Sequence, residues 1–443
     1  MQLKGTRFQP APETPRLSVR RLVFYILAIV AGLVILRLMD LKIVRSPFAP
    51  PPIPTRSSKS FAQEGVAFFD AGNLDRAIDA YRNAVGVDPK NPALWAELAR
   101  IQTYSSALML SNDSQALRLE EARASIDTAL NLDPEYGMGS AIRSLVLDWS
   151  ADPNLVDETT LQNYLNDAYK ASIKAQQLLP NDPLAMALQA EVLADQSNLA
   201  QALDVGRRAA DLGPGIMDVR RAYAYVLERN GYYEQATEQY RAAIEINYNL
   251  PFLHMRLGAN YRKIGESTTD PNIADTMIES ALKEFAVAKT LNPYDPGPYL
   301  SIANTYANQG DFFIAILNAQ KALSLAPTNA GLYGRLGAIY YKNKNYEGAL
   351  KVLKCAVRGC SAFENEEEGV DIKGEPLAAN TADFYYIYGS VLAFYGTDNN
   401  NCGLAADIFA ELRASPVFSS DIEGIIQEGE RICASYARRT PTP

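Results

Sequence analysis

The chain has 443 residues and a formal net charge of −9, and 48% of its residues are hydrophobic. That hydrophobic fraction is ample for a buried core. The acidic balance argues against nucleic acid as a partner, since phosphate binding needs clustered Lys and Arg. Histidine occurs once, at His254, so the commonest general base and metal ligand is nearly absent and catalytic functions are disfavoured.

The beginning of the chain predicts a short basic tail over residues 1–21 and a transmembrane helix over residues 22–41. Residues 22–36 carry no charge. About 20 apolar residues are enough to cross a bilayer if Arg37 snorkels to the interface. A cleaved signal peptide is the alternative, but no small-x-small cleavage site follows the apolar run. We therefore expect a single-pass anchor that contacts the lipid bilayer through residues 22–41.

Charge decides the orientation of this anchor only weakly, because basic residues stand on both sides of the apolar run. Long C-terminal domains translocate largely regardless of their charge, so the basic tail favours an N-inside orientation. The folded domain would then be extracytoplasmic, and a cytoplasmic location stays open. Residues 42–57 follow as a proline-rich stretch, which favours a polyproline II stalk.

A recurring pattern of small, aromatic and proline residues extends over nearly all of the chain after Ser58. The clearest copies carry Tyr299, Ala303, Tyr306, Gly310, Ala315, Ala322 and Pro327, and then Tyr333, Leu336, Gly337, Tyr340, Ala349, Leu353 and Ala356. This pattern resembles the tetratricopeptide repeat (TPR). The resemblance implies an all-α fold, a right-handed superhelical α-solenoid of TPR helix pairs, and the apolar run at residues 22–41 adds one transmembrane helix before it.

The copies divide the chain into consecutive segments. Residues 58–363 are expected to form repeats 1–8, residues 364–380 an acidic insertion, residues 381–413 a degenerate ninth repeat, and residues 414–443 a capping helix and tail. In the copies that begin near Trp95, Ser140 and His254, the two helices of the pair are pushed apart. The extra residues are either loops beside the binding surface or additional helical turns.

The four cysteines lie in the last quarter of the chain. Cys402 opens one predicted helix and Cys433 nears the end of the antiparallel capping helix, so the two are expected opposite each other. Cys355 and Cys360 lie five residues apart across a helix end, within reach of a local bridge. Two disulfides suit an oxidising, extracytoplasmic compartment, whereas buried free thiols are the alternative.

For ligand binding, the TPR resemblance implies a concave surface formed by outward positions of each first helix. In this sequence these positions are Arg221, Tyr225, Arg229, Arg262, Lys263, Asn304, Asn308, Tyr341 and Lys342. Basic residues recur at one repeat position, which predicts a groove for a peptide carboxylate or an acidic segment. The set does not match the two-carboxylate clamp of chaperone-binding members, and a solvated face without a ligand is the alternative.

The sequence supplies no recognisable catalytic centre. No nucleophile–base set and no phosphate-cradling glycine loop occurs, and His254 occupies a core position of its repeat. We therefore expect a non-enzymatic scaffold, without cofactor or metal, that binds other proteins or peptides at the cell envelope. A fixed structural subunit of a large membrane complex is the alternative, favoured by large apolar patches on the outer face. A remote alternative is an enzyme with an unrecognised site in residues 361–380.

Overall fold

The computed structural model describes residues 18–40, 56–109, 111–365, 368–395 and 401–437. The chain divides into two compact units, Met1–Arg56 and Ser57–Pro443. The described part of the first unit is a single exposed helix, α1 (Val19–Asp40). This helix is long and apolar enough to cross a membrane, a property that anchors and signal sequences share.

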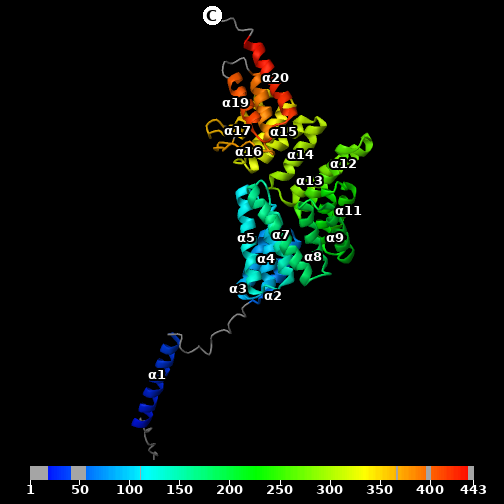
Figure 1. The fold of residues 1–443 in the computed structure, drawn as a ribbon. Helices are drawn as coiled ribbons and strands as arrows, with labels where there is room; N and C mark the ends of the chain where they lie inside the picture. The colour runs from blue at the N-terminus through cyan, green and yellow to red at the C-terminus, as the bar shows by residue number, and fades with distance from the viewer. Residues whose placement is uncertain (1–17, 41–55, 110, 366–367, 396–400, 438–443) are drawn as a thin grey trace, which may run out of the picture. The chain divides into compact units, whose positions relative to one another are not determined.

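The described residues of the second unit form helices that pair in chain order, α2 with α3 and onward to α18 with α19 (Figure 1). The first helices of the pairs are α2 (Ser58–Asp70), α4 (Pro92–Ser106), α6 (Gly137–Ser150), α8 (Pro183–Asp195), α10 (Met217–Arg229), α12 (Pro251–Ser267), α14 (Pro296–Gln309), α16 (Ala330–Lys342) and α18 (Ala382–Phe394). The second helices are α3 (Leu74–Val87), α5 (Asn112–Leu132), α7 (Glu158–Leu178), α9 (Leu199–Leu212), α11 (Tyr233–Ile246), α13 (Pro271–Leu291), α15 (Phe312–Leu325), α17 (Tyr346–Arg358) and α19 (Asn401–Ala414), and α20 (Ser420–Ala437) follows. The predicted all-α solenoid is confirmed.

The extra residues of the three interrupted copies lengthen second helices rather than forming long loops. Helices α5, α7 and α13 each contain 21 residues, whereas α3, α9 and α11 contain 14. The difference corresponds to about two helical turns. Each long helix begins at a capped residue, because the side chains of Ser111, Asp157 and Asp270 accept hydrogen bonds from the first turn.

Small and aromatic repeat positions meet inside each pair. A Cβ added at Gly258 on α12 would lie 2.6 Å from the ring of Phe285 on α13, so glycine is needed for the two helices to approach. Aromatic side chains at the start of first helices also bond to the turn before them. The hydroxyl of Tyr333 donates to the carbonyl of Pro327 (2.9 Å), and the indole of Trp95 donates to that of Pro89 (2.9 Å).

The first repeat contacts the turn between α11 and α12, far along the chain. The side-chain amide of Asn249 donates to the carbonyl oxygen of Asp70 (2.9 Å), and the amide of Asn247 lies 3.5 Å from the Asp70 carboxylate. Gly72, with φ of +75°, lies directly against the backbone of Asn249. We call these four residues the closure seam, because they join the two ends of the segment from α2 to α12.

The segment between α17 and α18 packs against the eighth repeat. Its main chain pairs with itself between Cys360 and Ile372, and the amide of Asn365 donates to the Tyr333 hydroxyl (2.8 Å). Glu364 forms an ion pair with Lys354. Hydrogen bonds from Lys354 and from the Ser361 backbone lower the pKa of this carboxylate to about 2.

Candidate functional site on the inner surface of the solenoid

The solenoid carries a cavity of about 580 Å³ that is lined mainly by first helices, with side chains from α5, α7 and α11 and from the turn between α6 and α7. Helices α4, α6, α8 and α10 contact one another in order, and α12 follows. The side chains that line the cavity include Asp148 and Trp149 on α6, Glu191 and Asp195 on α8, Arg221, Tyr225 and Arg229 on α10, and Phe252 and Arg256 on α12. We call this space the inner cavity.

Arg221 and Glu191 form a buried ion pair at one wall of the inner cavity. The two guanidinium nitrogens of Arg221 lie 2.6 and 2.5 Å from the two carboxylate oxygens of Glu191, and both side chains are about 5% exposed or less. The indole of Trp149 donates to the same carboxylate (3.1 Å), and its ring stacks on Arg221 at 5.6 Å. Because this bidentate pair neutralises the charge of Arg221 within the protein, that charge is not free to bind a ligand.

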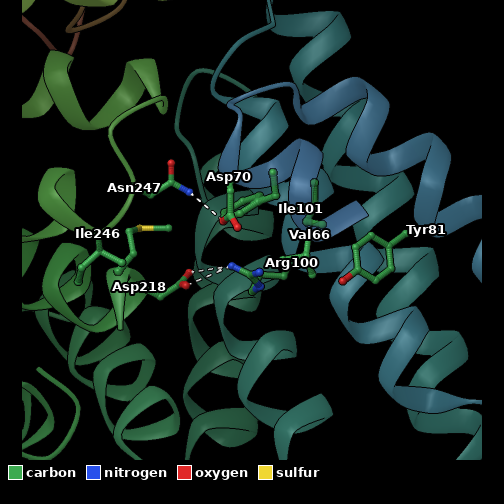
Figure 2. A pocket seen from close by; sticks show the side chains of 10 residues that line it. Val66, Asp70, Tyr81, Arg100, Ile101, Asp218, Ile246 and Asn247 are labelled. Atoms are coloured by element: carbon green, nitrogen blue, oxygen red, sulfur yellow. Dashed lines mark hydrogen bonds and ion pairs between the residues drawn. The ribbon is translucent and has the colours of Figure 1, made fainter. Parts of the chain in front are cut away.

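A second charged cluster joins α4 to α10 beside the closure seam. Arg100 lies 3.3 and 3.1 Å from the two carboxylate oxygens of Asp218, and the hydroxyl of Tyr104 donates to the same carboxylate. Burial and then the nearby Asp218 raise the pKa of Tyr104, so it stays a neutral donor. Figure 2 shows Arg100 facing Asp218, and Asp70 facing Asn247, across a cavity of about 140 Å³.

Asp148 and Asp195 supply two further carboxyl groups to the inner cavity. Asp195 accepts a hydrogen bond from the Tyr225 hydroxyl (2.5 Å) and lies 3.5 Å from Arg229. Asp148 is 6% exposed, and one of its carboxyl oxygens is buried without a hydrogen-bond partner. Burial, with the charges of Asp195 and Glu191, raises the pKa of Asp148 well above its usual range, and burial also raises that of Asp195.

Glu228 lies behind the inner cavity and binds two side chains that line it, Tyr240 and Arg256. Its carboxylate accepts from the hydroxyl of Tyr240 (3.0 Å), the amide of Asn260 (3.0 Å) and the guanidinium of Arg256 (3.2 Å). Each of the three arginines that line the cavity therefore has a carboxylate partner on the preceding first helix.

Family models for the tetratricopeptide repeat match four parts of the chain. One matches residues 63–103, 166–215 and 300–362, and a second matches residues 222–250. The chain is a tetratricopeptide repeat protein. TPR arrays of this kind are typical of non-enzymatic scaffolds for protein interaction.

Solved structures with a similar fold include human IFIT1. The IFIT1 dimer with m7Gppp-AAAA matches with a TM-score of 0.53 and 16% identity, over 88% of this chain and 91% of that chain. A monomeric IFIT1 mutant with m7Gppp-AAAA matches with a TM-score of 0.55 and 16% identity, over 86% and 81%. At this identity the likeness concerns the fold. No curated protein sequence matches the chain.

The prediction that nucleic acid is excluded as a partner is wrong. IFIT1, which has a similar fold, is seen with m7Gppp-AAAA and PPP-AAAA. The prediction rested on the net charge of the whole TPR chain, but a solenoid binds through the local charge of its inner surface. A net charge of −9 therefore does not decide the question.

Three of the side chains that the TPR pattern placed on the concave surface line the inner cavity, namely Arg221, Tyr225 and Arg229. Arg221 is buried in its pair with Glu191, and Tyr225 and Arg229 both engage Asp195. These groups therefore bind the protein's own carboxylates in place of an acidic ligand.

The other predicted groove residues lie on α12, α14 and α16. Lys342 donates to the side chain of Asn308 (3.0 Å), which donates in turn to Glu266 (3.0 Å). Lys263 is exposed, and Arg262 is half-buried over the ring of Phe285 at 5.6 Å. Asn304 and Tyr341 are half-buried, and the ring of Tyr341 lies 5.7 Å from that of Tyr346.

The cysteines are joined in two pairs. Cys355 is bonded to Cys360 across the end of α17, and Cys402 on α19 is bonded to Cys433 on α20. His254, in contrast, is 1% exposed and lies between the Tyr248 carbonyl (2.8 Å) and Glu284 (2.7 Å). Within the described ranges, no group of three His, Cys, Asp or Glu side chains is placed to hold a metal.

Sequence reasoning missed the acidic side chains of the inner cavity, Asp148, Glu191 and Asp195. They stand near the ends of first helices whose other residues are apolar or small, as in the buried stretch from Ala185 to Ala194. An acidic residue inside such a stretch is a usable signal, because a buried carboxylate needs a specific partner.

Proposed function

We propose that this TPR protein is a membrane-anchored scaffold that holds partner proteins against its inner surface at the cell envelope. The observation that carries the proposal is the inner cavity, about 580 Å³ in volume and lined by charged and titratable groups that stand mainly on first helices. Buried ion pairs contribute little net stability but fix one arrangement of the helices that carry them, so these pairs would hold the shape of the cavity that a partner enters. Exposed Lys263, with Asn304, Asn308 and Lys342, extends the same surface along α12, α14 and α16.

The anchor belongs to the same proposal. Helix α1 is of membrane-spanning length and composition, and a span there would hold the solenoid at the bilayer. The two cysteine pairs support an oxidising compartment, and hence an N-inside orientation with the solenoid extracytoplasmic.

A fixed subunit of a larger complex is the second candidate, because α15 exposes apolar side chains on its outer face. Phe313 is 76% exposed and Leu317, one helical turn later, is 51% exposed. Such a pair fits a permanent contact better than a solvated surface.

Site-specific photo-crosslinking in native membranes separates these candidates. A photoreactive residue replaces Lys263 on the inner surface, Leu317 on the outer face of α15, or Leu212 on α9 as an exposed control. We expect protein adducts from position 263 and none from position 212. Adducts from position 317 alone would support the fixed subunit, and nuclease-sensitive adducts from position 263 would replace the protein partner with nucleic acid.

A further inference from the structure

The inner cavity is lined by more carboxyl groups than its arginines neutralise. Arg221 pairs with Glu191, Arg229 with Asp195, and Arg256 with Glu228. Asp148 lines the same cavity and shares a hydrogen bond with the carboxyl group of Asp195, but among the described residues it pairs with no arginine, and one of its oxygens is buried without a hydrogen bond. An unpaired buried acceptor costs free energy unless a ligand or a proton satisfies it.

The walls around Asp148 are suited to an organic cation. The inner cavity contains the rings of Trp149, Tyr225 and Phe252. Two of these rings already contact cations of this chain, Trp149 beneath Arg221 at 5.6 Å and Tyr225 beneath Arg256 at 5.7 Å. Aromatic faces attract ammonium and guanidinium groups, whereas a metal ion needs several oxygen, nitrogen or sulfur ligands.

We propose that the inner cavity binds a lysine or arginine side chain of a partner protein, with Asp148 as the carboxylate that receives the cation. This inference rests on the proposed scaffold function and names the chemistry of its partner. A volume of about 580 Å³ admits one long side chain together with water. Asp152, which also lines the cavity, adds a second acidic group.

Asp148 stands among charged and titratable groups from every helix packed against α6. These are Glu191 and Asp195 on α8, Arg221 and Tyr225 on α10, Arg123 on α5, Tyr164 on α7 and Tyr104 on α4. Without a ligand, the raised pKa of Asp148 favours its protonated form. An incoming ammonium group takes the place of that proton, so binding should release a proton and strengthen as pH rises.

The test uses the full-length protein in lipid nanodiscs and a dye-labelled peptide of lysines alternating with glycines. Its control is the same peptide with every lysine acetylated. Fluorescence polarisation should give at least about tenfold tighter binding of the lysine peptide, because a charge-assisted hydrogen bond is worth roughly one decade or more. Affinity for the wild type should rise with pH, because a rising pH removes the proton that competes with the cation for Asp148.

Two variants that replace a carboxylate by an amide of the same shape test which residue receives the cation. Asp148→Asn should weaken lysine-peptide binding by about tenfold and reduce its pH dependence, which Asp195, whose pKa is also raised, retains in part. Asp211→Asn, at an exposed position on α9 outside the cavity, should change the affinity by about twofold or less. Circular dichroism checks that both variants keep their helix content.

Equal binding of the lysine and acetyl-lysine peptides would overturn the inference, and so would an unchanged affinity in Asp148→Asn. An oligoadenylate that binds more tightly than the lysine peptide, and tighter still to Asp148→Asn, would overturn it in favour of an anionic ligand. If protein crosslinks from position 263 persist in these cases, the scaffold function stands and only the cation assignment fails.

Discussion

Replacing Gly72 by Ala tests the closure seam, and Gly231 provides a matched control. Both glycines end a first helix with positive φ, +75° and +78°. Both also make the same turn bonds: each amide donates to the carbonyl three residues back, and the next amide donates five residues back. The difference is the surroundings, since a Cβ at Gly72 would lie 2.0 Å from the Asn249 carbonyl oxygen while nothing lies within 4 Å of one at Gly231.

The two substitutions therefore share one free-energy cost and differ in another. A left-handed alanine costs about 1–2 kcal/mol at either position. At Gly72 the seam must also open, which removes the bond between Asn249 and Asp70, worth about 0.5–1.5 kcal/mol, and adds steric strain. We expect Gly72→Ala to lower the free energy of unfolding by about 2–4 kcal/mol and Gly231→Ala by about 1–2.

Tryptophan fluorescence during urea unfolding is a suitable assay. The chain has two tryptophans, Trp95 on α4 and Trp149 on α6, so the emission reports the segment from α2 to α12 that the seam closes. The midpoint should fall further for Gly72→Ala than for Gly231→Ala at an unchanged slope. Equal shifts in the two variants would show that the seam contributes nothing to stability, and the reasoning would be refuted.

Three further predictions concern other parts of the molecule. Because the pKa of Asp148 is raised in the folded state, this group stabilises the fold at low pH, and the stabilisation is lost as pH rises through the folded pKa. The melting temperature of the wild type should therefore fall above about pH 4, and Asp148→Asn should make that fall smaller. Thermal scans from pH 4 to pH 8 measure the difference. An unchanged pH profile would contradict this. Deleting residues 1–45 should release a folded helical protein from membranes. Fractionation after a high-salt wash measures the release, and circular dichroism measures the helix content. Retention of the fragment on the membrane would contradict a single anchor. Mass spectrometry of the unreduced protein should find Cys402 joined to Cys433, and free alkylation of both thiols in freshly isolated protein would argue for a reducing compartment.

The helix pairs could be predicted because their signal is local. Gly258 and Phe285 belong to one repeat, and their small and large side chains identify the crossing point of α12 and α13. The inner cavity could not be predicted in the same way. Arg221 occupies an outward repeat position, yet it is buried because Glu191, 30 residues earlier, and Trp149 on α6 close over it.

The closure seam could not be predicted from the repeat pattern either, because its contacts join residues of distant repeats. Asn249 and Asp70 are 179 residues apart, and their contact depends on the pitch that several stacked pairs produce together. Each repeat contributes a small rotation to that pitch, and no single repeat motif encodes their sum.

The closure seam also changes how the chain should fold. In an open solenoid each repeat contacts its neighbours, so folding can nucleate anywhere and propagate along a low-contact-order chain. Here the bonds from Asp70 to Asn249 and from Arg100 to Asp218 close loops of well over a hundred residues, and the entropy of closing them must be lost before the contacts form. The segment from α2 to α12 should therefore fold slowly and as one cooperative unit, while the repeats after it retain the graded, end-to-end unfolding of an ordinary array.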